Sequence, residues 1–344
     1  MILISIKEHG EEMKAIAVFN NKGGVGKTTF LCNLAGFMQI EMGKKVLIVD
    51  ADPQCNTSTY VLDENTFYNA YYNRKVFTID DIIAPLKRGE GFIHTYQSSI
   101  SDAFGVDLIP GNPKFAASED FLARDWGEVM SSQIRGIRTN MLFIHFLTKC
   151  SDYDYVFFDM GPSLGAINRA VLLACDYFIT PMSADIFSLL ALENIGRSIC
   201  DWKQIFNEST GKLLEEDKSA LFGLKNVCDI KFLGYIEQQY ITKSVDGQRR
   251  VVKSYEQILD RIPKEIQKHI IEPINGLDPE VDYNIGSIPN FYSIIPMSQT
   301  AHKPIFQLNN SDGVLGAHYK KVNDYLKLIR NISGKVLRNM EALS

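Results

Sequence analysis

The sequence predicts an α/β fold, in which a doubly wound and mostly parallel β-sheet carries helices on both faces. Short, almost continuously apolar runs alternate along the chain with longer segments of helical spacing. This texture is typical of parallel strands that are buried on both sides. A glycine-rich loop at 21–26 separates the first strand from the first helix, and acidic residues end two of the apolar runs. Loops at the carboxyl ends of parallel strands are where ligands bind in such sheets.

The expected elements follow from the positions of these runs. The first strand, at 14–20 (KAIAVFN), leads through the glycine-rich loop into a helix at 27–40. Strands at 46–50 (VLIVD), 155–159 (YVFFD) and 176–180 (DYFIT) have the apolar character of buried parallel strands. Further expected elements are strands at 106–109 and 232–239, helices at 79–84 and 189–206, and a closing helix at 318–332.

The composition excludes several function classes. The 344 residues are 45% apolar with a formal net charge of −5, so disorder is excluded and any contact with nucleic acid must come from a local basic patch. The six cysteines are scattered singly, which argues against a zinc or iron–sulfur site and for reduced thiols. The first residues do not form a signal peptide, and no apolar run approaches the ~18 residues of a membrane span. We therefore expect a cytoplasmic protein.

The domain organisation is expected to be simple. We predict one domain over residues 1–344, with no internal repeat and no low-complexity linker. The stretch 241–285 differs in texture, because several basic residues are followed by a helix-like run. We interpret this stretch as an elaboration of the main domain.

The glycine-rich loop predicts a phosphate-binding site. Its glycines allow a tight turn that directs successive backbone N–H groups toward phosphate oxygens, and the following helix adds the positive end of its dipole. Lys27 can place a charge between the outer phosphates, and the Thr28 hydroxyl can bind Mg²⁺. The predicted nucleotide-binding residues are Lys22, Gly23, Gly24, Val25, Gly26, Lys27, Thr28 and Thr29.

Acidic side chains mark the ends of two strands. Asp50 and Asp52 come at and just beyond the end of the strand at 46–50, and Asp159 ends the strand at 155–159. Because the carboxyl ends of parallel strands meet at one edge of the sheet, these carboxylates are expected near the phosphate loop. An acid in the position of Asp159 is suited to hold Mg²⁺ through water. Gly161 gives the loop after it freedom to move with the γ-phosphate.

The loop N-K-G-G-V-G-K-T-T at 21–29 resembles the deviant Walker A motif, K-G-G-x-G-K-T-T, of the ParA and MinD family of P-loop ATPases, and ParA/Soj-type partitioning ATPases most of all. A strict P-loop pattern has glycine in the place of Asn21. In this family the first lysine crosses a dimer interface to reach the phosphates bound by the partner. The resemblance assigns that role to Lys22.

The acidic segments extend the resemblance. D-A-D-P-Q at 50–54 is similar to the D-x-D-P-Q switch of the family, by which Asp52 would orient or activate the attacking water and Asp50 would support Mg²⁺ and its waters. The segment that follows Asp159 departs from the family pattern D-x-P-P-S, because Gly161 replaces the first proline. Cys55 stands where relatives often have glycine.

Later segments also resemble the family. Gly234 to Tyr240 is similar to the strand that leads into the adenine pocket, and Ile288–Pro289 to one of the C-terminal loops. The resemblance therefore implies that Tyr240, Ile288 and Pro289 contact the adenine. It also implies the doubly wound fold of the family.

The resemblance implies a Mg-ATP-dependent switch. Such a chain binds ATP and Mg²⁺, forms a homodimer, and hydrolyses ATP slowly under stimulation by a ParB-like or other small partner protein. The dimer would bind DNA without sequence preference and act in plasmid, chromosome or cargo partitioning, associated with the nucleoid. A basic stretch follows the strand at 232–239, near the place where related chromosomal ParA proteins carry a DNA-contacting arginine. The expected DNA contacts are Lys243, Arg249, Arg250 and Lys253.

Other functions within the same fold remain as alternatives. A MinD-like ATPase would bind membrane through a basic, apolar tail, and the end at 319–343 has this mixture, but we favour a terminal helix docked on the core with solvated lysines. A regulatory ATPase of a mobile element is a second alternative. An electron carrier of the nitrogenase-reductase type is excluded, because no cysteine follows Asp159 in the loop 160–166.

Overall fold

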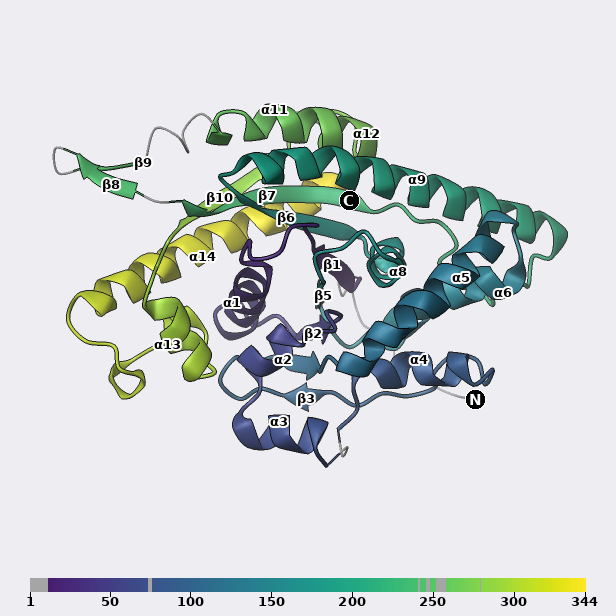
Figure 1. Cartoon of the computed structure of the whole chain (residues 1–344), viewed down its shortest axis with the longest axis horizontal. Coiled ribbons are helices and arrows are strands. Elements are labelled where there is room, and N and C mark those ends of the chain that lie inside the picture. Colours follow the sequence, from purple (N-terminus) through teal and green to yellow (C-terminus); the bar gives the residue numbers. More distant parts are fainter. Residues whose placement is uncertain (1–11, 74–75, 241, 246–247, 252–257, 279) are drawn as a thin grey trace.

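The computed structural model describes residues 12–73, 76–240, 242–245, 248–251, 258–278 and 280–344. An eight-stranded sheet runs through the middle of the molecule in the order β10-β7-β6-β1-β5-β2-β4-β3 (Figure 1). Its strands are β1 (Lys14–Val18), β2 (Val46–Asp50), β3 (Ser99–Ile100), β4 (Asp107–Ile109), β5 (Tyr155–Asp159), β6 (Tyr177–Ser183), β7 (Lys231–Tyr240) and β10 (Asn284–Pro289).

All neighbouring strands of this sheet are parallel except the edge pair β3 and β4. The central strands are apolar because both faces are covered, and every residue of β2 and β5 is buried. The register of β2 on β5 sets Asp50 opposite Asp159. The doubly wound parallel sheet that the sequence predicts is confirmed.

The helices form two layers, one on each face of the sheet. One layer packs α1 and the apolar side of α14 against the strands, and the other contains α4 to α9. The helices are α1 (Lys27–Ile40), α2 (Asn56–Val61), α3 (Glu64–Tyr71), α4 (Ile79–Lys87), α5 (Ser118–Met130), α6 (Ile134–Asn140), α7 (Leu142–Leu147), α8 (Ala166–Ala174), α9 (Ile186–Glu216), α11 (Ile262–Ile266), α12 (Glu272–Ile274), α13 (Ile294–Thr300) and α14 (Ala317–Leu343).

The expected elements are present, and several differ from the expectation in their bounds. The helices expected at 189–206 and 318–332 are the inner parts of the much longer α9 and α14. The pair Ile288–Pro289, expected in a loop, ends strand β10, which pairs in parallel with β7. Several helices of the layer that contains α4 to α9 have no counterpart among the expected elements, because their periodic segments are short.

The stretch 241–285 contains a small hairpin and short helices. Strands β8 (Thr242–Val245) and β9 (Gln248–Val251) pair antiparallel, with Lys243 opposite Arg250 and Ser244 opposite Arg249. A π-helical turn (Gln267–Ile271) lies between α11 and α12, and together they pack along α9. Lys253 lies outside the described residues.

The closing helix α14 is docked on the sheet. Its apolar side chains Val322, Ile329 and Val336 are buried in the core beneath it. No helix in the described part of the chain is long and apolar enough to cross a membrane. The apolar residues of 319–343 that suggested a membrane-binding tail therefore belong largely to the core.

Candidate nucleotide-binding site

The phosphate loop lies between the end of β1 and the start of α1. Gly24 and Gly26 have φ angles of 74° and 80°, in the left-handed region that side chains disfavour and glycine adopts freely. Gly26 stands at the N-cap of α1, whose first turn contains no acidic residue. The loop therefore presents backbone N–H groups and the positive end of a 14-residue helix to an anion.

Lys27 is held inside this loop. Only 7% of its surface is exposed, and its Nζ donates to the carbonyls of Asn20 (3.3 Å) and Lys22 (3.2 Å). Burial lowers the pKa of Lys27, while Asp159 and Asp52 act in the opposite direction. A buried cation bound only to backbone carbonyls is suited to bind a phosphate that supplies the missing negative charge.

Asp159 provides one half of a cation site. Its Oδ2 accepts hydrogen bonds of 2.7 Å from the hydroxyls of Thr28 and Thr57. Its Oδ1 is buried and has no hydrogen-bond partner among the residues that the structure describes. Burial raises the pKa of this carboxyl, and the two threonine hydrogen bonds oppose the rise. The unpartnered oxygen beside a threonine hydroxyl matches the oxygen ligands that Mg²⁺ requires.

The rest of the Mg²⁺ ligands would come from nucleotide and water. In the described part of the chain no three or more His, Cys, Asp or Glu side chains gather into a metal site. Mg²⁺ in nucleotide sites typically uses one or two protein oxygens together with phosphate oxygens. The residues present therefore fit Mg²⁺ in its nucleotide-bound form.

Asp52 lines the cavity next to the loop that follows β5. Its Oδ1 accepts from the backbone N–H of Gln54 at 2.9 Å, which fixes the side chain within its own turn. A Cβ added to Gly161 would stand 3.3 Å from the same oxygen. The glycine thus allows the β5 loop to approach Asp52 closely, and the carboxylate faces the space beyond the phosphate loop.

Asp50, which was expected to support Mg²⁺ and its waters, is held by helix α2. It is fully buried, and its Oδ2 accepts from the backbone N–H and the hydroxyl of Ser58 at 2.8 and 2.6 Å. Burial, followed by the charge of Asp159, raises the pKa of Asp50 to about 8. Asp50 is not among the described residues that line the cavity. Its contacts anchor the N-terminal part of α2 to β2.

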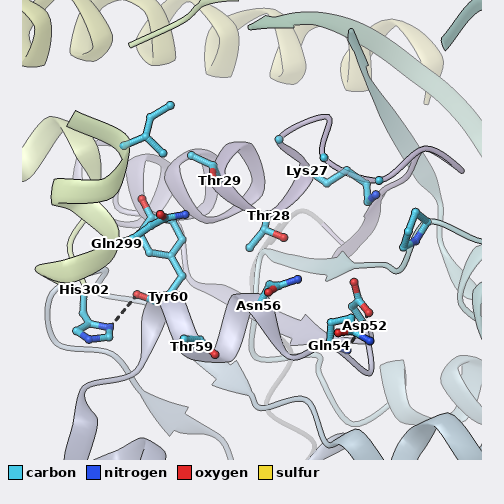
Figure 2. A pocket seen from close by; sticks show the side chains of 15 residues that line it. Lys27, Thr28, Thr29, Asp52, Gln54, Asn56, Thr59, Tyr60, Gln299 and His302 are labelled. Carbon is cyan, nitrogen blue, oxygen red and sulfur yellow. Dashed lines mark hydrogen bonds between the residues drawn. The ribbon is translucent and has the colours of Figure 1, made fainter. Parts of the chain in front are cut away.

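The side chains enclose one cavity of about 640 Å³ (Figure 2). In Figure 2, Lys27 and Asp52 lie at one end, whereas Gln299, His302 and Tyr60 lie at the other. The lining residues are Gly23, Gly24, Gly26, Lys27, Thr28, Thr29, Asp52, Gln54, Asn56, Thr59, Tyr60, Pro162, Ile295, Gln299 and His302. No sequence motif indicates that α2 and the segment around α13 line the cavity. They meet only through packing, as the 238 positions between Tyr60 and Ser298 illustrate.

A hydrogen-bonded core joins these two segments below the cavity. The hydroxyl of Tyr60 accepts from Asn33 Nδ2 at 3.0 Å and contacts the hydroxyl of Ser298. The ring of His302 lies 3.3 Å from the Tyr60 carbonyl oxygen, measured from Nδ1. The distal wall of the cavity is therefore fixed to α1 and α2.

Two of the residues expected to contact adenine, Ile288 and Pro289, lie in one hollow. Ile288 and Pro289 line a small hollow beside Thr29, together with Gln238 and Ile295. Gln238 is 5% exposed, and its Nε2 donates to the Gly26 carbonyl at 3.4 Å. Sequence reasoning missed Gln238, which is two positions from the expected Tyr240. Tyr240 is the last residue of β7.

Lys22 has a partner within its own chain. Its Nζ contacts the carboxylate of Asp185, which caps the N-terminus of α9. Beside this pair, α9 exposes three apolar side chains, Ile186, Phe187 and Leu190. An exposed apolar group at the rim of a ligand site is typical of a surface that another protein covers.

A carboxylate from α5 supports the loop that follows Asp159. Glu119 accepts hydrogen bonds from the backbone N–H groups of Ala166 and Ile167, in the first turn of α8. Asn168, in the same first turn of α8, donates to the carbonyls of Gly161 and Ser163 at 2.7 Å each. These contacts tie the loop 160–165 to α5 and α8. No sequence motif indicated Glu119.

The expected DNA contacts lie on a separate element. Lys243 belongs to β8, and Arg249 and Arg250 belong to β9. The structure therefore puts three of the four expected residues on one hairpin.

Comparison with known proteins agrees with this geometry. A family model described as an AAA domain matches residues 13–211. The chromosome partitioning protein ParA of Caulobacter vibrioides is 28% identical over 189 residues, which are 54% of this chain and 62% of that protein. The chain therefore spans less than two thirds of that relative.

Two solved structures show the fold. The DIP2308 protein of Corynebacterium diphtheriae is 31% identical with a TM-score of 0.69, covering 84% of this chain and 97% of that one. A Borrelia burgdorferi structure described as a plasmid partition protein bound to AMPPNP is 19% identical with a TM-score of 0.58, covering 95% and 99%. With its deviant phosphate loop, doubly wound sheet and these matches, the chain belongs to the ParA-like family of P-loop AAA-domain proteins.

Proposed function

We propose that this chain is a Mg-ATP-dependent, dimerising ATPase that acts as a partition switch. The observation that carries the proposal is that Lys27, Thr28 and Asp52 line one cavity beside the phosphate loop, where the Thr28 hydroxyl also donates to Asp159. The AMPPNP bound to the Borrelia neighbour supports ATP as the ligand.

Each residue has a defined task in this proposal. Lys27 neutralises the outer phosphates, and the loop N–H groups bind their oxygens. Thr28 and Asp159 hold Mg²⁺, which draws negative charge away from the phosphates. Asp52 lines the same cavity, where its carboxylate would orient a water for attack on the γ-phosphate. Gly161 keeps this space open.

The proposed dimer rests on Lys22 and its surroundings. Lys22 belongs to the phosphate loop and contacts Asp185. Phe187 and Leu190, which follow Asp185 in α9, have exposed fractions of 69% and 62%. A second chain seated on this rim would cover the apolar side chains and bring its own Lys22 toward the phosphates. A water-excluding interface of this kind strengthens charge interactions with phosphate.

We propose that the dimer binds DNA without sequence preference and partitions its cargo in this way. Basic residues on the β8–β9 hairpin would bind phosphates without base recognition, and the dimer would present two such hairpins. A ParB-like or other small protein would stimulate hydrolysis. A MinD-like membrane role finds less support, because the apolar side chains of α14 are used in the core. A regulatory ATPase of a mobile element would use the same site.

Phosphate release tests the enzymatic proposal. We expect slow release of phosphate from ATP that requires Mg²⁺ and is absent from Lys27→Ala, because that variant lacks the buried cation of the loop. A Lys44→Ala variant serves as the control, since it removes a lysine that does not line the cavity. Equal turnover by Lys27→Ala and wild type would overturn the proposal.

A further inference from the structure

A second cavity, of about 670 Å³, lies between α4, α5 and α6, at the side of the molecule where α5 and α6 project in Figure 1. We call it the α4–α6 groove. Its lining is Leu86, Lys87, Arg88, Gly89, Gly91, Phe121, Arg124, Ile134, Arg135, Arg138 and Thr139. Five of these described residues are cationic and none is acidic, in a chain whose net charge is −5.

The cations differ in how firmly they are engaged. The guanidinium of Arg138 donates to the Ala220 carbonyl at 2.7 and 3.1 Å, and Lys87 pairs with Asp80 at 3.5 Å. Arg124 and Arg135 share the fully buried Asp125. Arg135 also pairs with Glu128 at 3.7 Å, and Arg88 pairs with Glu90 at 2.6 Å. Each of the five cations therefore already has a partner.

The side chains of Arg88, Arg124 and Arg135 nonetheless remain available to a ligand. They are 57%, 60% and 63% exposed. Ion pairs at such exposure contribute little, about 0–1 kcal/mol, so an incoming carboxylate can exchange with the existing partners. Arginine also binds carboxylates in a bidentate manner.

The floor of the groove distinguishes between classes of anion. Leu86, Phe121 and Ile134 contribute apolar surface, and the Arg124 guanidinium lies 5.2 Å from the centre of the Phe121 ring. Duplex DNA is a wide, convex cylinder that would contact only the rim of a hollow of this size. A peptide can insert an apolar side chain into the hollow while its acidic side chains meet the arginines.

We propose that the α4–α6 groove is a docking site for an acidic segment of a partner protein, one that carries an apolar anchor between glutamate or aspartate residues. Charge complementarity accelerates the encounter and orients the segment, and the apolar floor adds burial. The peptide-binding step requires neither nucleotide nor hydrolysis.

The groove also has a structural connection to the nucleotide site. Helix α5 supplies Phe121 and Arg124 to the groove and Glu119 to the first turn of α8. A segment seated on α5 would thereby act on the helix that holds the loop after Asp159. This consequence, but not the binding itself, rests on the proposed ATPase function.

The experiment measures the fluorescence anisotropy of a fluorescein-labelled peptide of glutamates with interspersed phenylalanines. A peptide with glutamine in place of each glutamate is the neutral probe. The test variant is Arg88→Gln/Arg135→Gln, which leaves Asp125 its contacts with Arg124 and Thr139. The matched control is Arg197→Gln/Arg330→Gln, which removes two arginines of similar exposure that do not line the groove. Thermal melting checks that all variants are folded. Arg88→Gln alone is the second test variant, because the ion pair of Arg88 within the described part of the chain is with the exposed Glu90.

We expect the acidic peptide to bind wild type and the control pair equally, and the test variant roughly tenfold more weakly, with binding that weakens as salt is raised. The neutral peptide should bind weakly to all. Equal binding by test and control variants overturns the proposal, as does equal binding of the two peptides. A random duplex oligonucleotide is titrated in parallel, and a loss confined to the duplex would assign the groove to nucleic acid and overturn the proposal as well.

Discussion

The ammonium group of Lys22 contacts the carboxylate of Asp185, and the same carboxylate caps the first turn of α9 by accepting from the N–H groups of Phe187 and Ser188. The lysine that the family passes across its dimer interface is therefore bound within its own chain. In the proposed dimer, the phosphates of a second chain would compete with Asp185 for Nζ.

The first prediction removes this competition. Asp185→Asn lacks the charge but keeps an oxygen for the α9 cap, because asparagine is an equally good N-cap. We expect the dimer with AMPPNP to form at roughly 1.5- to 5-fold lower protein concentration, as the loss of a part-exposed ion pair of ~0.2–1 kcal/mol implies. Light scattering over a dilution series measures the shift.

Two further variants decide how this result is read. Asp201→Asn removes an exposed carboxylate from the same helix and should leave the dimer unchanged. Lys22→Ala should weaken both the dimer and hydrolysis. If Lys22→Ala formed the dimer as readily as wild type, the lysine would have no role between chains.

A second prediction separates nucleotide binding from chemistry. Asp52 lines the cavity, and its Oδ1 accepts from the Gln54 N–H within its own turn, so Asp52→Ala should bind ATP with wild-type affinity. Turnover should fall by a factor on the order of 10² or more, the usual contribution of a group that orients or deprotonates water. Equilibrium binding of a fluorescent ATP analogue and phosphate release, measured on one preparation, test both halves. Undiminished turnover would remove Asp52 from the mechanism.

The third prediction concerns Mg²⁺. Asp159→Asn replaces the carboxylate whose Oδ1 is buried without a partner, and an amide is a poorer ligand for a hard cation. We expect nucleotide affinity measured with Mg²⁺ to fall several-fold, whereas affinity measured in EDTA should remain near that of wild type. Calorimetric titration in both conditions gives the comparison. A loss of equal size in EDTA would show that Asp159 acts on the fold and not on the metal.

The fourth prediction concerns the support of the Asp159 loop. Glu119→Ala removes the acceptor of two N–H groups at the start of α8, and loss of such a cap costs about 1 kcal/mol. We expect a lower Tm and slower hydrolysis, and Glu119→Gln, which retains acceptor oxygen, should recover part of both. Asp120→Asn, an exposed neighbour in the same turn, is the control. A Glu119→Ala protein with unchanged melting would show that the cap is dispensable.

The sequence predicted the parts of the site that are local in the chain. Gly24, Gly26, Lys27 and Thr28 lie within one turn between a strand and a helix, so their spacing alone defines the loop. Asp159 was predictable because it ends an apolar strand that parallel pairing must bring beside β1.

Other parts of the site depend on packing between distant segments. Glu119 reaches α8 across 47 positions, and Ser298 reaches Tyr60 across 238. Neither residue carries a local signal, because its partner is chosen by the way the helices pack. The burial of Asp50 was likewise invisible in the sequence, since the contact of its Oδ2 with Ser58 comes from the packing of α2 on β2. Its Oδ1 is buried without a hydrogen-bond partner among the described residues, so its part in binding Mg²⁺ stays a prediction.

The last prediction tests DNA binding by the β8–β9 hairpin. Lys243, Arg249 and Arg250 fall on its two strands, so a dimer would offer two basic hairpins to one duplex. Phosphate contacts release counterions, and affinity should therefore fall steeply with salt while varying little with base sequence. Filter binding of random duplex DNA with AMPPNP and Mg²⁺ should show this for wild type. The affinity for DNA should fall strongly in Arg249→Ala/Arg250→Ala. It should not fall in Arg197→Ala/Arg330→Ala, which deletes equal charge from α9 and α14. Equal binding by both double variants would exclude the hairpin, and no binding by wild type at low salt would exclude DNA as the substrate of the switch.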